Sequence, residues 1–217
     1  MSGENIIIDA GGACFITRVS EENNEWFFSI DNPGGDLYEA EEIFRLKGEV
    51  EGTTLQLFRY PSGEKFVPVP KKNGICLGNP VMHDGKISIL AVDFVRRRIT
   101  IKGFDCADHT VTVTAEMSLD ETEDCYNLML HEHPLTLTRQ PNDGMFHIIW
   151  PERISFPIGN RESFYHRDGN ELYFSRWFED PDYREETVIR DVNSGKIVSV
   201  FPGSMYVMPD GDKWFLK

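Results

Sequence analysis

The sequence predicts an all-β fold, and three observations point to it. Short runs of alternating apolar and polar residues recur along the chain, aromatic residues make up 12% of it, and 18 glycines and 12 prolines interrupt it. Alternation with a period of two is typical of strands that have one face in the core and one in solvent. Glycine and proline favour the turns between such strands. With 217 residues the chain can bury a large core, so we expect residues 1–217 to form a single all-β domain.

The strand patterns are short and end close to Gly, Pro, Asn or Asp, as expected for half-buried antiparallel strands. They include KISILAVDF at 86–94, RRITIKGF at 97–104, HTVTVTAEM at 109–117 and PLTLTRQ at 134–140. Helix signals are scarce. The best candidate is DLYEAEEIFRLKGEV at 36–50, where Asp36 can cap a helix and apolar residues follow near helical spacing. We expect this helix to span one or two turns at most.

Turn markers repeat along the chain and predict antiparallel units of four strands and about 40 residues each. Asp-Gly occurs four times, and three of these pairs stand between an apolar run and a strand rich in large apolar residues. Ser-Gly occurs in the matching stretches LFRYPSGEKFVPV and VIRDVNSGKIVSV. The predicted units are Trp26 to Val69, Asn79 to Leu119, Cys125 to Ile158 and Ser163 to Val200.

Two fragments remain at the ends of the chain, and together they would complete a fifth unit. Ile6 to Val19 predicts two strands around a glycine turn, and Met205 to Lys217 predicts two more. This organisation resembles small β-propellers, whose rings are often closed by a blade drawn from both termini. The resemblance implies a five-bladed propeller closed by N- and C-terminal strands. WD-repeat signatures are absent, and a β-sandwich or barrel is the alternative.

The charge of the chain limits its partners. It has 36 acidic and 22 basic side chains, which gives a net charge of −14. Nucleic acids and anionic membranes would repel such a protein, so we expect neither as a partner. The charge permits a cationic partner, namely a basic protein, a polyamine or a divalent metal. Charge that only maintains solubility is the simplest explanation.

The cysteines and the first residues indicate an intracellular location. Cys14, Cys76, Cys106 and Cys125 form no Cys-x-x-Cys pair, so we expect reduced, buried thiols. The start, MSGENIIIDAGG, lacks the basic and long apolar regions of a signal peptide, and no run approaches the roughly 18 apolar residues of a membrane span. The sequence therefore predicts a cytoplasmic protein, and it gives no sign of a cofactor.

A His-Glu-His stretch at His131 to His133 is a candidate metal site. Residues i and i+2 of a strand point the same way, so His131 and His133 could share a metal ion, with His147 approaching from a neighbouring strand. Three imidazoles with an open fourth position are typical of catalytic zinc. The pair is similar to the His-x-His of cupins, but the glutamate that cupins have downstream is missing here. A solvated loop before Pro134 is the alternative.

The segment RWFEDPDYREE at 176–186 is the candidate binding site. It interleaves the aromatic residues Trp177 and Tyr183 with the acidic residues Glu179, Asp180 and Asp182. Aromatic anchors in a charged rim suit recognition of another molecule. Glycosidases also place carboxylates beside aromatic platforms. In propeller glycosidases, however, the catalytic carboxylates come from different blades, whereas this group belongs to one predicted loop.

Two classes of function follow from these patterns. The preferred one is a non-catalytic binding module that recognises a basic protein or a carbohydrate through acidic-aromatic loops. The alternative is an enzyme, either a small carbohydrate-active propeller of the glycoside hydrolase type or a His-x-His metalloenzyme. The binding hypothesis predicts that Trp177 and Tyr183 are exposed near Glu179 and Asp182.

Overall fold

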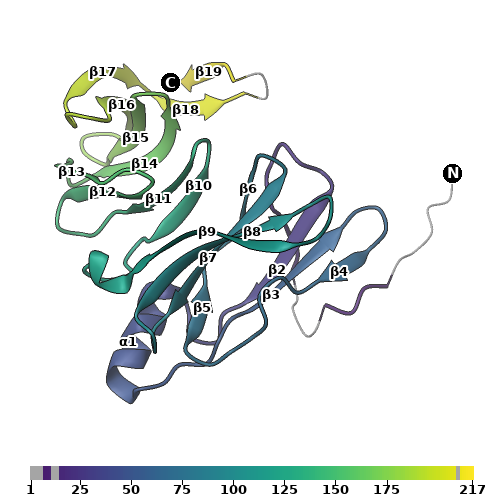
Figure 1. Ribbon diagram of the computed structural model, residues 1–217. Helices are drawn as coiled ribbons and strands as arrows, with labels where there is room; N and C mark the ends of the chain where they lie inside the picture. Colours follow the sequence, from purple (N-terminus) through teal and green to yellow (C-terminus); the bar gives the residue numbers. More distant parts are fainter. Residues whose placement is uncertain (1–6, 11–14, 209–210) are drawn as a thin grey trace, which may run out of the picture. The chain divides into compact units, whose positions relative to one another are not determined.

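The computed structural model describes residues 7–10, 15–208 and 211–217, and it confirms the all-β class (Figure 1). Contacts divide the chain into two compact units, Met1–Cys125 and Tyr126–Lys217, which we call unit 1 and unit 2. Cys14, the glycine pair expected to turn the N-terminal strands, and Asp210 of the last Asp-Gly pair lie outside the described residues. That the whole chain forms one domain stays a prediction.

The first sheet of unit 1 has four antiparallel strands in the order β1-β2-β3-β4. Their bounds are β1 Thr17–Arg18, β2 Trp26–Asp31, β3 Thr54–Arg59 and β4 Glu64–Phe66. The second sheet has β5 Ile75–Leu77, β6 Val81–His83, β7 Lys86–Asp93, β8 Arg98–Asp105 and β9 Val111–Ser118. Strands β5 and β6 pair with successive stretches of β7, so together they fill one strand position. Pro80 stands in the gap and has no N–H for a ladder bond.

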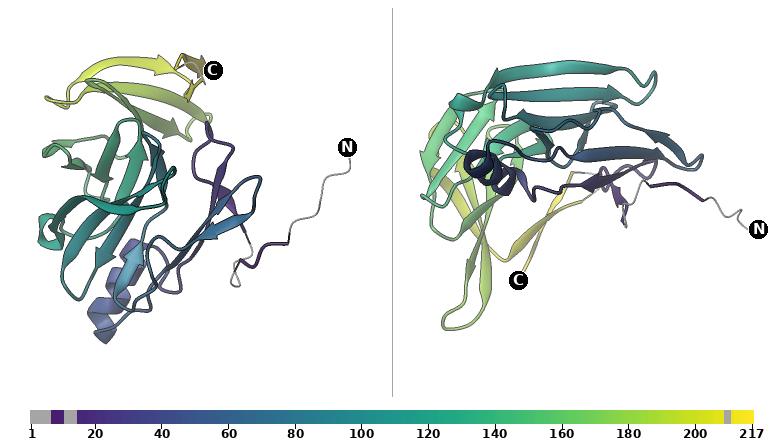
Figure 2. Two further views of the ribbon diagram at one scale, coloured as in Figure 1. Left: turned by 45° about the vertical axis from the view of Figure 1, so that its right-hand side comes forward. Right: turned by 90° about the horizontal axis from the view of Figure 1, so that it is seen from below.

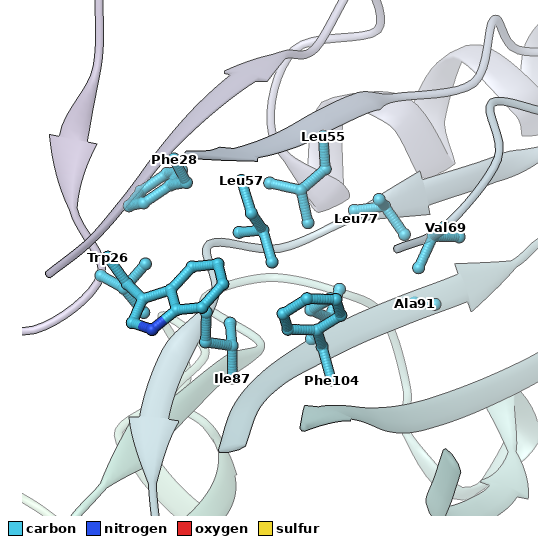
Figure 3. Packing of buried hydrophobic residues seen from close by; sticks show 11 residues of the cluster. Trp26, Phe28, Leu55, Leu57, Val69, Leu77, Ile87, Ala91 and Phe104 are labelled. Carbon is cyan, nitrogen blue, oxygen red and sulfur yellow. The ribbon is translucent and has the colours of Figure 1, made fainter. Parts of the chain in front are cut away.

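The core of unit 1 draws its side chains from both sheets. Trp26 and Leu57 come from the first sheet, and Ile87 and Phe104 come from the second (Figure 3). Ile89 of the second sheet belongs to the same core. The ring centroid of Trp26 lies 5.5 Å from those of Phe66 and Phe104. The alternating apolar positions of the predicted strands thus pack face to face, as in other two-layer β structures.

Helix α1, Leu37–Lys47, begins where the sequence predicted a helix but is longer than expected. Its 11 residues make about three turns rather than one or two. Asp36 accepts a hydrogen bond from the Glu39 N–H while the Glu39 carboxylate accepts one from the Asp36 N–H, a capping box that satisfies two end groups. Gly48 ends the helix with φ of 76°. The Asp-x-x-Glu spacing in the sequence marks where this helix begins.

Unit 2 contains two four-stranded antiparallel sheets and a hairpin. The third sheet has β10 Met129–Glu132, β11 Leu135–Arg139, β12 Met145–Trp150 and β13 Ile154–Pro157. The fourth has β14 Glu162–Asp168, β15 Glu171–Phe178, β16 Arg184–Asp191 and β17 Ile197–Pro202. In each sheet the strands pair with their neighbours in chain order (Figures 1 and 2). These two sheets match the predicted units Cys125 to Ile158 and Ser163 to Val200.

The sheets of unit 2 pack through a core of phenylalanine and aliphatic side chains. Phe146, Ile148 and Phe156 of the third sheet meet Leu172 and Phe174 of the fourth. On the opposite face of the fourth sheet, Tyr173 and Ile189 pack against Met205 of the hairpin. That hairpin consists of β18 Ser204–Val207 and β19 Lys213–Leu216. Both faces of the fourth sheet are therefore partly buried.

The expected closure through a shared terminal sheet is not seen in the described part of the chain. Strand β19 pairs with β18 in a two-stranded sheet, while β1 pairs with β2. The reason is local: Asn23 accepts hydrogen bonds from the N–H groups of Glu25 and Trp26, so residues 20–25 form a turn and β1 folds back onto β2. A local pairing costs less loop entropy than one with the far end of the chain. A propeller-like arrangement of the four larger sheets stays a prediction.

Cys76, Cys106 and Cys125 form no disulfide in the described residues, as expected; Cys76 and Cys125 are buried, and Cys106 is half-buried. Burial raises the pKa of the Cys76 and Cys106 thiols to about 11, so both are protonated and unreactive at neutral pH. Within the described ranges, no helix combines the length and the hydrophobicity needed to cross a membrane. The cytoplasmic location stays a prediction.

Candidate functional site

The predicted binding segment is the hairpin of β15 and β16 with its connecting loop, residues 179–183. The two strands pair without a register shift, and Trp177 on β15 lies opposite Glu185 on β16. The sequence placed Trp177 in a loop, but β15 continues through Phe178. Trp177 is therefore held by the strand ladder, while Glu179, Asp180 and Asp182 follow on the loop.

The predicted exposure of this segment is confirmed. Trp177 is 38% exposed and Tyr183 is 67% exposed. The side chains of Glu179, Asp180 and Asp182 are also exposed, so the loop presents carboxylates and aromatic rings together. We call these five residues the acidic-aromatic loop. Large exposed aromatic residues beside charges are typical of recognition surfaces, because their burial on binding contributes most of the affinity.

Arginine side chains stack on the aromatic rings at the base of this loop. The guanidinium of Arg161 lies 5.4 Å from the ring centroid of Trp177, and that of Arg184 lies 4.2 Å from the ring centroid of Phe178. Arg176 also lies over Phe178, at 5.6 Å. These cation–π contacts hold the rings in place. The sequence analysis missed Arg161, which comes from another strand connection.

A buried ion pair fixes the strands beneath the loop. The side chain of Glu162 on β14 is 1% exposed, and Arg190 on β16 donates to both of its carboxylate oxygens at 2.9 and 3.1 Å. Arg176 on β15 approaches the same carboxylate at 3.7 Å. One carboxylate thus joins three neighbouring strands. Arg190 also donates to the carbonyl oxygen of Gly195, so its charge is hydrogen-bonded on a second side.

A polar pocket of about 200 Å³ lies beside Trp177. Its lining includes Arg161, Trp177 and four residues with side-chain amides: Asn127, Gln140, Asn142 and Asn160. Gln140 is committed to the fold, because its amide donates to the Glu162 carbonyl at 2.6 Å and accepts from the Phe164 N–H at 2.9 Å. Asn160 and Arg161 are exposed and can reach a ligand. No sequence motif marked this pocket, since its wall comes from several separate turns.

The three histidines predicted as metal ligands occupy different environments. His131 lies on β10, and its Nε2 is 2.8 Å from the Thr138 hydroxyl. His133 is exposed in the turn before Pro134. His147 lies on β12 opposite Arg139, and its Nδ1 is 2.8 Å from the Ser155 hydroxyl. Among the described residues, no group of three or more His, Cys, Asp or Glu side chains is arranged to hold a metal ion. The structure therefore adds no support to the metal hypothesis.

His131 instead predicts a pH dependence of stability. Its ring packs edge-on against Phe164 at 4.7 Å, and burial lowers its pKa from 6.5 to about 4. The folded protein binds fewer protons at this residue than the unfolded chain does between these pH values. The free energy of unfolding should therefore fall as the pH decreases from about 6.5 toward 4.

Urea denaturation at several pH values tests this, with His131→Gln as the comparison, because glutamine keeps a hydrogen-bonding group but does not ionise. We expect the variant to lose stability less steeply over this pH range than the native protein. Parallel curves for the two proteins would contradict a buried, neutral His131.

Comparisons with known proteins leave the family open. The chain matches no protein-family model and no curated protein. Among solved structures, it is similar to a Bacteroides ovatus protein proposed to be a dipeptidyl aminopeptidase IV, with a TM-score of 0.41 and 12% sequence identity. The likeness covers 73% of this chain and 28% of that one, so the chain spans less than a third of the protein it resembles.

Proposed function

We propose that this protein is a non-catalytic binding module that recognises a basic segment of a partner protein through the acidic-aromatic loop. The observation that carries this proposal is the joint exposure of Trp177 and Tyr183 with three carboxylates on one hairpin. The two aromatic rings supply apolar contact area, and the carboxylates supply attraction and orientation.

The electrostatics of the loop support a cationic partner. Within the part of the chain that the structure describes, the carboxylates of Glu179, Asp180 and Asp182 have no ion pair with a basic side chain. Arg184 donates to the backbone carbonyl of Asp180 rather than to a loop carboxylate. These charges are therefore available to a partner, and the net charge of −14 attracts a basic chain from a distance.

The same exposure favours binding over hydrolysis. A glycosidase needs one carboxylic acid whose pKa is raised, usually by burial, and a second carboxylate across the scissile bond. Glu179, Asp180 and Asp182 are all exposed on a single five-residue loop, residues 179–183. A surface of this kind serves recognition without a catalytic step.

Binding of a lysine- and arginine-rich peptide, followed by fluorescence anisotropy, tests the proposal. We expect the native protein to bind the labelled peptide and to lose affinity as salt increases from 50 to about 300 mM, because salt screens charges at a rim. The triple variant Glu179→Gln, Asp180→Asn, Asp182→Asn should bind about tenfold more weakly, since each exposed charge contributes at most about 1 kcal/mol.

A triple variant in unit 1 serves as the matched control. Glu21→Gln, Glu49→Gln and Glu64→Gln remove the same charge from exposed positions. This control should keep most of the affinity. Equal weakening by both triple variants would mean that only net charge matters, and that result would overturn a defined binding loop. A salt-insensitive interaction would overturn the electrostatic basis of the proposal.

A carbohydrate is the second candidate ligand, and the polar pocket beside Trp177 favours it. Side-chain amides and an aromatic ring are the groups that hydrogen-bond and stack on sugars. A glycan array would test this candidate. If a glycan binds, Asn160→Ala and Trp177→Ala should each weaken binding, whereas the triple loop variant should leave it nearly unchanged.

A further inference from the structure

A second pocket of unit 2 lies between the fourth sheet and the last hairpin, with a volume of about 260 Å³. Three buried residues from three strands are among those that line it: Phe174, Thr187 and Met205. Tyr165 and Tyr206 form part of its wall and are each about half exposed, at 49% and 50%. The polar groups of the wall belong to Ser175, Glu185 and Ser204.

Two features of the backbone position the residues that line this pocket. The β14–β15 ladder shifts register between Phe164 and His166, and Tyr165 stands at this bulge. Bulges commonly redirect side chains near functional sites. On the other side, Gly203 has a φ of 99°, and its N–H donates to the Glu185 carbonyl at 2.8 Å. An added Cβ at Gly203 would lie 1.8 Å from the carbonyl oxygen of Leu216, so this position requires glycine.

Glu185 carries the charge of this pocket. Hydrogen bonds from the hydroxyls of Ser204 and Tyr183 hold its pKa below the usual range, so it is ionised at neutral pH. Among the described residues, both partners of this carboxylate are neutral hydroxyls. Neighbouring carboxylates differ: Glu186 pairs with Arg176, and Glu162 pairs with Arg190. A carboxylate has about four acceptor positions, so two hydroxyl donors leave room for a ligand cation.

From this geometry we infer that the pocket of Tyr165, Glu185 and Tyr206 accepts the alkylammonium side chain of a lysine in the basic partner segment. The inference rests on the proposed function and names its anchor residue. The apolar lining suits the methylene stem of lysine, the two tyrosine rings attract an ammonium group by their faces, and Glu185 neutralises its charge. A pocket of about 260 Å³ lies below the 300–1,000 Å³ of typical small-molecule sites, which fits one side chain better than a whole ligand.

The pocket joins the acidic-aromatic loop through one residue. Tyr183 belongs to the loop, and its hydroxyl donates to Glu185 of the pocket. Glu185 itself lies opposite Trp177 on the neighbouring strand. A basic segment that contacts the loop carboxylates can therefore place a lysine beside Glu185. Tyr183 and Glu185 thus connect the loop with the pocket.

NMR titration of the full-length protein tests this inference with two probes that differ only at the end of the side chain. N-acetyl-lysine methylamide carries the ammonium group, and N-acetyl-norleucine methylamide is its uncharged counterpart. We expect the lysine probe to shift the signals of Ser204, Met205 and Tyr206 and to bind about tenfold more tightly than the norleucine probe. Equal affinity for both probes, or no shift at these residues, would overturn the inference.

Two variants test whether the residues of this pocket cause the preference for lysine. Glu185→Gln removes the charge while keeping a group of similar shape, and it should abolish the preference for lysine over norleucine. Tyr206→Leu removes a ring face at an exposed position and should weaken lysine binding severalfold. Tyr60→Leu, at an exposed tyrosine of unit 1, is the matched control and should change nothing. Native-like binding by both pocket variants would place the lysine elsewhere.

These experiments distinguish a failure of the lysine pocket from a failure of the proposed function. If Glu185→Gln leaves binding of the basic peptide unchanged while the triple loop variant weakens it, the proposed function holds and the lysine pocket is wrong. If the lysine probe binds at Ser204 to Tyr206 but no basic peptide depends on the loop charges, the pocket holds and the proposed function is wrong.

Discussion

Replacing Glu162 by Gln should lower the free energy of unfolding by about 3–5 kcal/mol, because it leaves Arg190 buried without its counter-ion. The Glu162 side chain is 1% exposed and receives two hydrogen bonds from Arg190. Arg190 is itself buried, so water cannot replace the lost partner. Urea denaturation followed by circular dichroism measures this change.

Glu186→Gln is the matched control for this substitution. Glu186 pairs with Arg176, but both side chains are about a quarter exposed. Because solvent screens this pair, its loss should cost about 1 kcal/mol or less. A double variant, Glu162→Met with Arg190→Met, should recover part of the stability lost in Glu162→Gln, since it removes both buried charges. Similar costs for Glu162→Gln and Glu186→Gln would show that burial does not govern these pairs.

Replacing Trp26 by Ala should be equally damaging to unit 1, with an expected loss of about 3–5 kcal/mol. Trp26 is 1% exposed in the core of unit 1 (Figure 3), and its ring contacts those of Phe66 and Phe104. Removing the indole leaves a cavity that these rings fill only in part. Denaturation in urea measures the loss, and a lower midpoint with an unchanged slope would indicate a change of stability alone.

Trp214→Ala is the control, because Trp214 is 56% exposed on the last hairpin. Its replacement should change the free energy of unfolding by about 0.5 kcal/mol or less. If Trp214→Ala destabilised the protein as much as Trp26→Ala, the hairpin would hold the fold together in a way that its two-stranded sheet does not indicate. That result would support the predicted closure of the fold by the C-terminal strands.

The alternation of apolar residues located the strands well, because one face of each strand must be buried. Lys86–Asp93 and Arg98–Asp105 lie where KISILAVDF and RRITIKGF predicted them. The turn markers also divided unit 2 into its two four-stranded sheets. The sequence analysis did not recognise Asn23 as the residue that organises a turn between β1 and β2, and a sheet shared by the two chain ends stays a prediction.

In the candidate site, too, local sequence patterns predicted some features and missed others. Polar and acidic residues between two strong strand patterns were sufficient to predict that Trp177 and Tyr183 are exposed. The contacts of Arg161 with Trp177, and of Ser204 with Glu185, join residues far apart in the sequence. No local pattern could indicate them, since they depend on which strands become neighbours.

By itself, the sequence determined the all-β class, most strand positions and the exposure of the acidic-aromatic loop, because burial of one strand face imposes a two-residue period that can be read locally. Only the tertiary structure decided that β1 pairs with β2, that Glu162 binds Arg190, and that Tyr165, Glu185 and Tyr206 line one pocket. Those outcomes depend on the packing of distant strands, where loop entropy and the burial of charge select one arrangement from many compatible with the same local pattern.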